Sequence, residues 1–518
     1  METQKSMLKN KLVIWFATGW LCVGLVGNHV TAQEPHALPE RENQVPQAWV
    51  NHQLRPLRKF GQPQLPALFP SSFDRWRISP QPQYLSSAAL PVRVSQNLVP
   101  SDRGSQAETQ AEPHVAVNPD NPTNLIATYQ DSRFANGGAL ALTYATSFDG
   151  GQTWIESVVP GLSRVSGGPW DRATDPWVAF GSDNRAYLVS LAFQERSPEN
   201  EIAVSSSTDG GLTWGSPVTV IRSIDNFNDK ETITVDTSPA SPFRGNVYVT
   251  WDANVFGSDG ATIRQELVLS RSTDQGQTWS DPIKIRRKGA NIGVIPRVGP
   301  DGSLYTVWAG GSIQGNRIWL FFSKSMDAGQ TWSKPKKLQE MTNRGIAGAR
   351  TGDFLPSFDV DPVSGELFVG WQDARWTGID QVTLISSRDK GETWTAPRRV
   401  SSVTDDAPCF TVSVATNPNG DVAVSYYSFA HDPERRFLTD LFLQVSTDGG
   451  KTFGTPQRVT PASFDLRYAA QARGFFLGDY IGLAGSSAGF HLLWVGTDLP
   501  SAFDNFRRQP DVFFATVP

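Results

Sequence analysis

The sequence predicts an all-β chain built from repeated units of four short antiparallel strands. One octamer pattern returns six times between residues 147 and 453, and such self-similarity is the signature of a repeat architecture. Alternating apolar and polar residues precede each octamer, as at 139–144 and 265–270, which is the pattern of a strand with one buried face. The six octamers are SFDGGQTW (147–154), STDGGLTW (207–214), STDQGQTW (272–279), SMDAGQTW (325–332), SRDKGETW (387–394) and STDGGKTF (446–453).

Each octamer is predicted to be a hairpin turn between two strands. An Asp side chain accepts backbone N–H groups within a tight turn, the following Gly permits a positive φ, and the Thr hydroxyl fixes the exit. Successive aspartates are 60, 65, 53, 62 and 59 residues apart, which is enough for four short strands and their loops. These aspartates are Asp149, Asp209, Asp274, Asp327, Asp389 and Asp448.

The octamers resemble the Asp box, or BNR repeat, of the sialidase-like β-propellers. The resemblance in repeat pattern covers about 110–518 and implies a β-propeller of four-stranded antiparallel blades. In that family the box joins the third and fourth strands of a blade, on the face away from the ligand. The resemblance therefore implies that the six aspartates are structural, whereas fold-level likeness alone does not name a reaction.

The number of blades follows from the candidate first strands. The sequence contains seven such starts, one more than there are octamers, and the last unit supplies only three strands. We therefore expect seven blades, with Val92–Ser95 as the missing fourth strand, which would join the two ends of the chain. Six blades is the alternative, if the last segment completes an existing blade. The seven starts lie near His114, Trp177, Thr232, Val294, Pro356, Thr411 and Tyr480.

A leader and an arm are expected before the repeats. Residues 1–32 run from a basic start through an apolar stretch to small residues, the order of a secretory signal peptide. The apolar stretch is shorter than the roughly 20 residues that a membrane-spanning helix needs, so no span is expected after cleavage. Residues 33–90 are rich in proline and are predicted to be a linker or surface arm, and 91–518 form the propeller. We expect the protein to be secreted, periplasmic or at the cell surface.

Composition excludes several classes of function. The chain has 46 Lys and Arg against 51 Asp and Glu, a net charge of −5, and no dense basic run, so nucleic acid is not an expected partner. It has 2 Cys, one of them in the predicted leader, and 6 His, so no metal site and no cofactor are expected. The expected partner is a glycan or glycoconjugate, and the expected oligomeric state is a monomer.

Function is expected on the face opposite the octamers, because loops between strands carry most binding residues. Loops between second and third strands share an aromatic-Gln-Asp-small-Arg phrase at 129–133 and 371–375. Charged residues also gather where the chain crosses from one blade to the next. These crossings include 171–177, 228–231, 350–353 and 473–480.

For these loops the resemblance implies the chemistry of a sialidase: arginines that bind a sugar carboxylate, an acid, and a Tyr nucleophile activated by a Glu. An ion pair that stiffens its loop is an equal alternative for each Asp-x-Arg phrase. The catalytic candidates are Asp131 as acid, Glu231 as partner base and Tyr480 as nucleophile. The substrate-binding candidates are Arg133, Arg375, Arg473, Asp373, Asp380 and Asp479, of which Asp380 is a rival for the role of acid.

The leading hypothesis is an exported, sialidase-like glycoside hydrolase of the exo-α-sialidase type, acting on terminal acidic sugars. The family's Arg-Ile-Pro phrase before a first strand is missing, since the corresponding places read Glu112-Pro113-His114, Val294-Ile295-Pro296 and Phe354-Leu355-Pro356. This departure and the extra blade favour an alternative, a non-catalytic propeller that binds a glycan or a protein at the cell surface. A hydrolase or lyase that acts on another polysaccharide is the third hypothesis.

Overall fold

The computed structural model describes residues 90–518, apart from 101, 103, 258–259, 313–316, 435–436 and 498–508. The predicted leader lies outside the described residues, and so does the predicted arm except for its last residue. The helical elements of the described part are two 3₁₀ turns, η1 (Arg164–Ser166) and η2 (Leu466–Tyr468). Neither turn has the length or the apolar character of a helix that crosses a membrane. The prediction of an all-β chain is confirmed.

Seven four-stranded antiparallel units make up the body of the fold, and in six of them the strands pair in chain order. A single bridge between Ala139 and Ala173 joins the first two units into one sheet. The first three units are β2 (Gln110–Asn118), β3 (Asn121–Arg133), β4 (Ala139–Ser147) and β5 (Ile155–Val158); β6 (Arg172–Phe180), β7 (Ala186–Phe193), β8 (Asn200–Ser207) and β9 (Val218–Ser223); and β10 (Asn226–Val235), β11 (Val247–Phe256), β12 (Thr262–Ser272) and β13 (Ile283–Arg286). The next three are β14 (Ala290–Val298), β15 (Leu304–Gly311), β16 (Ile318–Ser325) and β17 (Lys336–Met341); β19 (Ser357–Val360), β20 (Leu367–Asp373), β21 (Gln381–Ser387) and β22 (Arg398–Arg399); and β23 (Cys409–Thr416), β24 (Val422–Ser428), β25 (Leu438–Ser446) and β26 (Gln457–Arg458).

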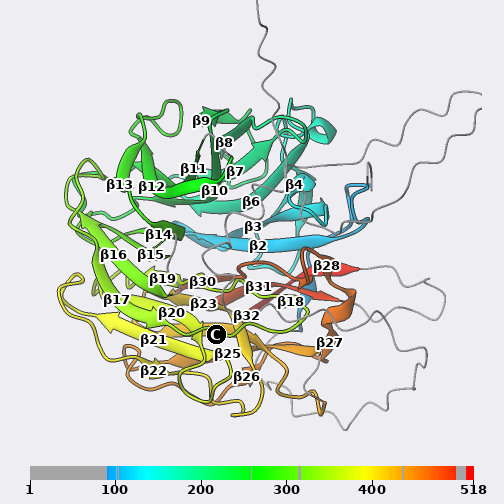
Figure 1. Ribbon diagram of the computed structural model, residues 1–518, viewed down its shortest axis with the longest axis vertical. Helices are drawn as coiled ribbons and strands as arrows, with labels where there is room; N and C mark the ends of the chain where they lie inside the picture. The colour runs from blue at the N-terminus through cyan, green and yellow to red at the C-terminus, as the bar shows by residue number, and fades with distance from the viewer. Residues whose placement is uncertain are drawn as a thin grey trace, which may run out of the picture.

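The seventh unit combines the two ends of the described chain. Its order is β30-β31-β32-β1, and Val92 of β1 lies opposite Phe514 of β32. In Figure 1 the blue strand β2 of the first unit lies beside the red strands of the seventh. The strands of this unit are β30 (Gly482–Ser486), β31 (Gly489–Thr497), β32 (Pro510–Val517) and β1 (Val92–Arg93). Four further short strands lie outside the seven units: β18 (Ala349–Arg350), β27 (Phe464–Asp465), β28 (Ala470–Gln471) and β29 (Phe475–Phe476).

The first strands of the units form the inner ring of the molecule. They contact one another in cyclic order, from β2 through β6, β10, β14, β19 and β23 to β30, which contacts β2 again. The second strands of four units carry a tryptophan that is at most 2% exposed, namely Trp251, Trp308, Trp371 and Trp494. Burial of such large apolar side chains is the main favourable term in sheet-on-sheet packing.

The same irregularity interrupts five of the first strands. β2, β6, β10, β14 and β23 each shift register against their second strand, and one residue at each shift has a φ between 50° and 68°. A positive φ costs a non-glycine residue of order 1–3 kcal/mol, and a bulge re-aims the side chain that it carries. The five residues are Glu112, Asp175, Lys230, Gly293 and Thr411, and the three charged ones come together in one pocket.

The six octamers form closely similar turns. In the first, Asp149 accepts hydrogen bonds from Ser147 Oγ (2.8 Å), the Thr153 backbone N–H (2.9 Å) and Thr153 Oγ1 (2.6 Å). These hydrogen bonds, led by the one from the Thr153 hydroxyl, lower the pKa of Asp149 to about 2. Each of the other five aspartates accepts the matching three bonds within its own turn.

Candidate functional site

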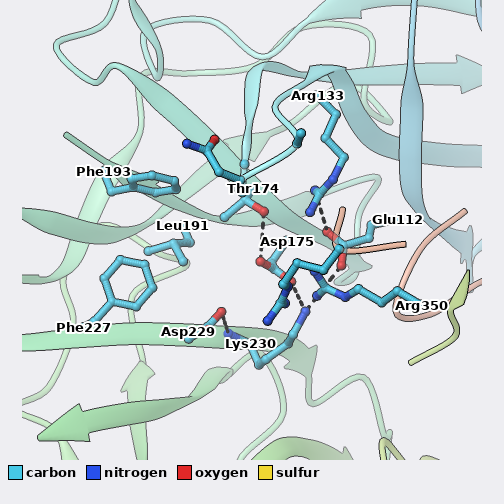
Figure 2. A pocket seen from close by; sticks show the side chains of 15 residues that line it. Glu112, Arg133, Thr174, Asp175, Leu191, Phe193, Phe227, Asp229, Lys230 and Arg350 are labelled. Atoms are coloured by element: carbon cyan, nitrogen blue, oxygen red, sulfur yellow. Dashed lines mark hydrogen bonds and ion pairs between the residues drawn. The ribbon is translucent and has the colours of Figure 1, made fainter. Parts of the chain in front are cut away.

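A pocket opens where the first three units meet two of the crossings. The bulges of β2, β6 and β10 form its floor, the loop 135–138 between β3 and β4 forms one wall, and the crossings contribute Arg350 and Arg473. Figure 2 shows the charged side chains of these elements pointing toward one another. Its charged lining residues are Glu112, Arg133, Asp175, Asp229, Lys230, Arg350 and Arg473.

Lys230 is the hub of the pocket floor. Its ammonium Nζ lies 2.7 Å from Asp175 Oδ1, 2.7 Å from Asp479 Oδ2 and 3.3 Å from Glu112 Oε1, so it joins carboxylates from the first unit, the second unit and the crossing before the seventh unit. All four side chains are less than 10% exposed. A buried charge is stable only when it is paired, and the three carboxylates hold the pKa of Lys230 well above its usual value although burial opposes this.

Three arginines surround the space above Lys230. The guanidinium carbons of Arg133 and Arg350 lie 4.4 Å and 4.6 Å from the centre of the Phe476 ring, so one ring positions both side chains. Arg350 also donates a hydrogen bond from Nε to Asp479 Oδ1 (2.8 Å) and a second, from its terminal nitrogen, to the other carboxylate oxygen. Arg473 is exposed at the rim, and desolvation within the pocket followed by the nearby Arg350 lowers its pKa.

Two of the carboxyl groups are poised to hold a proton near neutral pH. Burial, and next the charge of Asp175, raise the pKa of Asp229 to about 7, and burial raises the pKa of Glu112 to about 7 as well. The oxygens of Glu112 already accept from Gln130 and Lys230. Asp229 accepts from the backbone N–H of Lys230 at 2.9 Å and lines the pocket, so it is better placed to give a proton to a ligand.

The opposite side of the pocket is apolar. Leu191, Phe193 and Phe227 line it, and Figure 2 shows their side chains facing the charged cluster across the space. Gly138 of the wall has a φ of +68°, and a Cβ there would lie 2.9 Å from the Phe193 ring, so the loop needs glycine at this position. The pocket therefore suits a ligand with one anionic and one apolar side.

The structure brings some of the predicted binding residues together and leaves others apart. Arg133 and Arg473 both line the pocket, and Asp479 lies beneath it as a partner of Lys230. Arg375 lies elsewhere, where it forms an ion pair with Asp373 of its own loop at 2.9 Å. That pair corresponds to the loop-stiffening alternative that the sequence left open.

Asp380 also forms its hydrogen bonds among the loops around the fifth unit and not in the pocket. It accepts hydrogen bonds from the backbone N–H groups of Arg344 (2.7 Å) and Gly345 (2.8 Å) and from Asn343 Nδ2 (2.7 Å). It is 1% exposed, and burial raises its pKa to about 7. Its contacts anchor the neighbouring crossing, and it does not line the pocket.

The predicted catalytic residues do not gather around the arginines. Tyr480 lines a second cavity, enclosed by the first strands, and its hydroxyl donates to the Pro176 carbonyl at 3.3 Å. Glu231 is fully buried, and neither of its carboxylate oxygens has a hydrogen-bond partner among the described residues, so burial raises its pKa well above the usual value. Lys230 lines both cavities.

Asp131 is buried within the first unit, on β3 between β2 and β4. It accepts from Gln110 Nε2 at 3.0 Å and from Thr143 Oγ1 at 3.2 Å, and burial raises its pKa to about 7. Asp131 does not line the pocket, although Arg133, two residues later in the same phrase, does. The turn at Ser132, whose φ is +56°, separates the directions of the two side chains.

Five of the seven charged residues that line the pocket were not named as candidates from the sequence: Glu112, Asp175, Asp229, Lys230 and Arg350. All of them except Glu112 lie in the crossings at 171–177, 228–231 and 350–353 where charged residues gather. A signal for three of them exists in the chain. Glu112, Asp175 and Lys230 each stand three residues before a Val or Ile of their strand. A charged residue that repeats at the start of successive inner strands indicates a polar site near the axis of the ring. Among the described residues, no group of three or more His, Cys, Asp or Glu side chains is arranged to hold a metal ion.

Comparison with known proteins gives a partial likeness. No family model matches the chain. The chain is similar to a protein named sialidase from Bacteroides fragilis (strain YCH46), with 24% identity over 313 residues, which are 54% of this chain and 52% of that protein. The chain thus spans about half the length of the curated relative that it matches.

Three solved structures are similar to the chain at low identity and with TM-scores below 0.5. Hadza microbial sialidase Hz136 has a TM-score of 0.44 and 17% identity, with 76% of each chain covered. The α-L-arabinanase of Penicillium chrysogenum, complexed with arabinobiose, has a TM-score of 0.44 and 15% identity over 66% of this chain and 94% of its own. The leech intramolecular trans-sialidase has a TM-score of 0.42 and 12% identity over 65% of this chain and 67% of its own.

Proposed function

We propose that this protein is a glycoside hydrolase that removes a terminal acidic sugar, which it binds in the pocket above Lys230. The observation that carries the proposal is the gathering of Arg133, Arg350 and Arg473 around one pocket beside Asp229, a carboxyl group with a pKa of about 7. Three guanidinium groups around one space provide paired hydrogen bonds for a carboxylate. A terminal acidic sugar carries such a carboxylate. When the carboxylate is bound by the arginines, the glycosidic bond of the sugar is within reach of Asp229 as a proton donor.

The proposed chemistry uses two carboxyl groups in different protonation states. Asp229 protonates the glycosidic oxygen as the bond to the leaving group breaks, because its raised pKa keeps the proton available near neutral pH. Asp175 is the second carboxylate, held in place by Lys230 at 2.7 Å and by Thr174 Oγ1 at 2.9 Å. It takes a proton from the water molecule whose oxygen bonds to the sugar carbon as the glycosidic bond breaks. Glycoside hydrolysis usually relies on two carboxyl groups, of which one serves as acid and the other as base or nucleophile because their environments differ.

The arrangement of the sheets and the sequence likeness support the same proposal. We propose that the seven units are the blades of a closed seven-bladed propeller, since their first strands contact one another in a full cycle. The relative from Bacteroides fragilis is named sialidase, so a sialoside is the first acidic sugar to test. Export through the basic and apolar leader at 1–32 is part of the proposal, because acidic glycans of this kind are displayed outside cells.

Turnover of fluorogenic glycosides tests the proposal. Wild type, Asp229→Asn and Arg388→Ala are incubated with 4-methylumbelliferyl glycosides of N-acetylneuraminic acid, glucuronic acid and the neutral sugar L-arabinofuranose. We expect release from an acidic sugar and a loss of about 10²-fold or more in Asp229→Asn, the usual contribution of a general acid. Arg388, whose side chain is 58% exposed in an octamer turn, is the matched control and is expected to retain full activity. Equal cleavage of the neutral sugar, or none of the acidic ones, would overturn the proposal.

A non-catalytic glycan-binding propeller is the second candidate. The observation that favours it is the position of Tyr480 and Glu231, which lie away from the arginines in or beside the second cavity. Calorimetric titration with free N-acetylneuraminic acid separates the two candidates. Binding that depends on Arg473, together with no turnover of any glycoside, would establish this second function in place of the first.

A further inference from the structure

A second cleft, which shares no lining residue with the arginine pocket, lies between the third and fourth units at the outer edge of the molecule. No Asp or Glu is among the nine residues that line it. It lies beside β13 and β17, which are the last strands of their units and therefore the farthest from the inner ring. Its cationic and aromatic lining residues are Arg286, Lys288, Arg317, Lys337, Trp319 and Phe321.

Three of the four cations in this cleft, Arg286, Lys288 and Lys337, form no ion pair among the described residues, whereas Arg317 Nε lies 3.4 Å from Glu340 Oε1. Arg286 donates from Nε to the carbonyl of Lys288 at 3.2 Å, and burial alone lowers its pKa. Because no carboxylate lines the cleft, a bound anion would balance the charge of these cations.

Aromatic rings hold two of these cations in position. The ammonium of Lys337 lies 3.2 Å from the centre of the Trp319 ring, and the guanidinium of Arg286 lies 4.8 Å from the centre of the Phe321 ring. Phe321 in turn stacks on the buried Trp308, with centroids 5.7 Å apart and an interplanar angle of 13°. Cation–π contacts of this kind are worth about 0.5–1 kcal/mol at exposed sites, and they fix the cations before a ligand arrives.

The cleft opens toward the same end of the sheets as the arginine pocket. It includes Gly311 at the end of β15 and Trp319 near the start of β16, so it belongs to the loops between second and third strands. The octamer turns join third to fourth strands at the opposite end, as at 325–332 between β16 and β17. The loop 135–138 that walls the arginine pocket likewise joins a second to a third strand.

We propose that this cleft binds the chain of an anionic glycan, one whose sugars carry carboxylate or sulfate groups at intervals. The choice of a glycan rests on the proposed function of the pocket, whereas the choice of an anion rests only on the three unpaired cations. A nucleic acid is less suited, because the net charge of the chain is −5 and repels a dense polyphosphate beyond the reach of the cleft. The cleft and the pocket thus form two separate sites on one end of the molecule.

The affinity for an acidic hexasaccharide tests this proposal. Hexagalacturonate is titrated into wild type, the double variant Lys288→Ala/Lys337→Ala, the pocket variant Arg473→Ala and the control Lys451→Ala, whose exposed lysine lies in an octamer turn. Two exposed cation contacts of about 0.5–1 kcal/mol each correspond to a rise in Kd of roughly 5- to 30-fold in the double variant. Lys451→Ala is expected to bind like wild type, and Arg473→Ala is expected to keep the cleft-dependent binding.

Four outcomes would overturn the proposal, the last of which concerns the pocket variant. One is a folded double variant, checked by circular dichroism, that binds hexagalacturonate as wild type does. Another is equal affinity for a neutral hexasaccharide, and the third is equal or tighter binding of single-stranded DNA with the same loss in the double variant. If Arg473→Ala alone removes all binding, the pocket function stands and the cleft proposal fails. If no glycoside is turned over but the double variant still loses affinity, the cleft proposal stands and the pocket proposal fails.

Discussion

Replacement of Lys230 by methionine tests whether this side chain is the hub of the pocket floor. The change keeps an unbranched side chain that is one atom shorter and removes a buried ammonium that lies within 3.3 Å of three carboxylates. Removal of one partner from a buried ion pair leaves uncompensated charge and costs about 3–5 kcal/mol. We therefore expect the free energy of unfolding of Lys230→Met to be about 3–5 kcal/mol lower than that of wild type at pH 8.

The same variant is expected to recover stability as the pH falls. Glu112 has a pKa raised from 4.5 to about 7 in the folded protein, so the stability gained by protonating it is complete below pH 4.5 and is lost as the pH rises through 7. Loss of the Lys230 charge raises the pKa of Glu112 and Asp229 further, which makes the penalty largest above pH 7. At pH 5 these two carboxyls are protonated, and the destabilisation should fall to roughly half. A remainder persists because Asp479 stays ionised in the variant: Arg350, which the substitution leaves in place, still lowers its pKa although burial opposes this.

Urea denaturation followed by tryptophan fluorescence at pH 8 and at pH 5 measures both effects. The matched control is Lys390→Met, which removes an exposed ion pair with Asp301 at 2.5 Å and is expected to cost less than about 1 kcal/mol at either pH. A destabilisation of Lys230→Met that is below 1 kcal/mol, or that is equal at the two pH values, would refute the description of Lys230 as a buried hub.

Further predictions concern a turn, the pH profile and a loop. Gly151→Ala should lower the free energy of unfolding by about 1–3 kcal/mol more than Gly150→Ala. Both glycines have a positive φ, but only a Cβ at Gly151 overlaps the Phe514 ring. Equal losses in urea denaturation would contradict this prediction. The kcat for an acidic glycoside should fall above pH 7, because the acid Asp229 must be protonated and its pKa is about 7; a pH profile flat from 6 to 9 would exclude it as the acid. Arg375→Ala should cost about 1 kcal/mol of stability through its ion pair within the loop and leave KM unchanged; a large rise in KM would return it to the binding site.

Much of the fold could be predicted from the sequence because the chain repeats a local rule. The octamer turn is specified by hydrogen bonds within eight residues, as at Ser147, Asp149 and Thr153, so its structure does not depend on distant contacts. The first strands were located near residues such as His114, Trp177 and Thr232, which lie within β2, β6 and β10. The pairing of Val92 with Phe514 was expected from counting strands, since the last unit lacked one.

The site was harder to predict because its geometry depends on distant units. Arg133 and Arg473 were identified from charged loops, but the third pocket arginine, Arg350, is defined by contacts with Asp479 and Phe476 far away in sequence. The phrase that contains Asp373 and Arg375 matches the phrase at 129–133 closely, yet it forms its own ion pair.

The left-handed bulges are a further feature that strand periodicity alone does not reveal. Lys230 points into the pocket because its φ is +53°, whereas an unbroken strand would direct it by simple alternation.

The most direct test of the central claim is the preference for a carboxylate, measured as a ratio of kcat/KM values. The ratio compares the acidic glycoside that wild type cleaves best with its analogue in which the carboxylate is reduced to an alcohol. Charge-assisted hydrogen bonds worth about 1.5–3 kcal/mol predict a ratio of roughly 10- to 150-fold in wild type. In Arg473→Ala this ratio should fall by at least about 10-fold. Arg473 is exposed, so its replacement is expected to leave the fold intact. A wild-type ratio near one, or a ratio that Arg473→Ala leaves unchanged, would contradict the claim that this arginine pocket selects an acidic sugar.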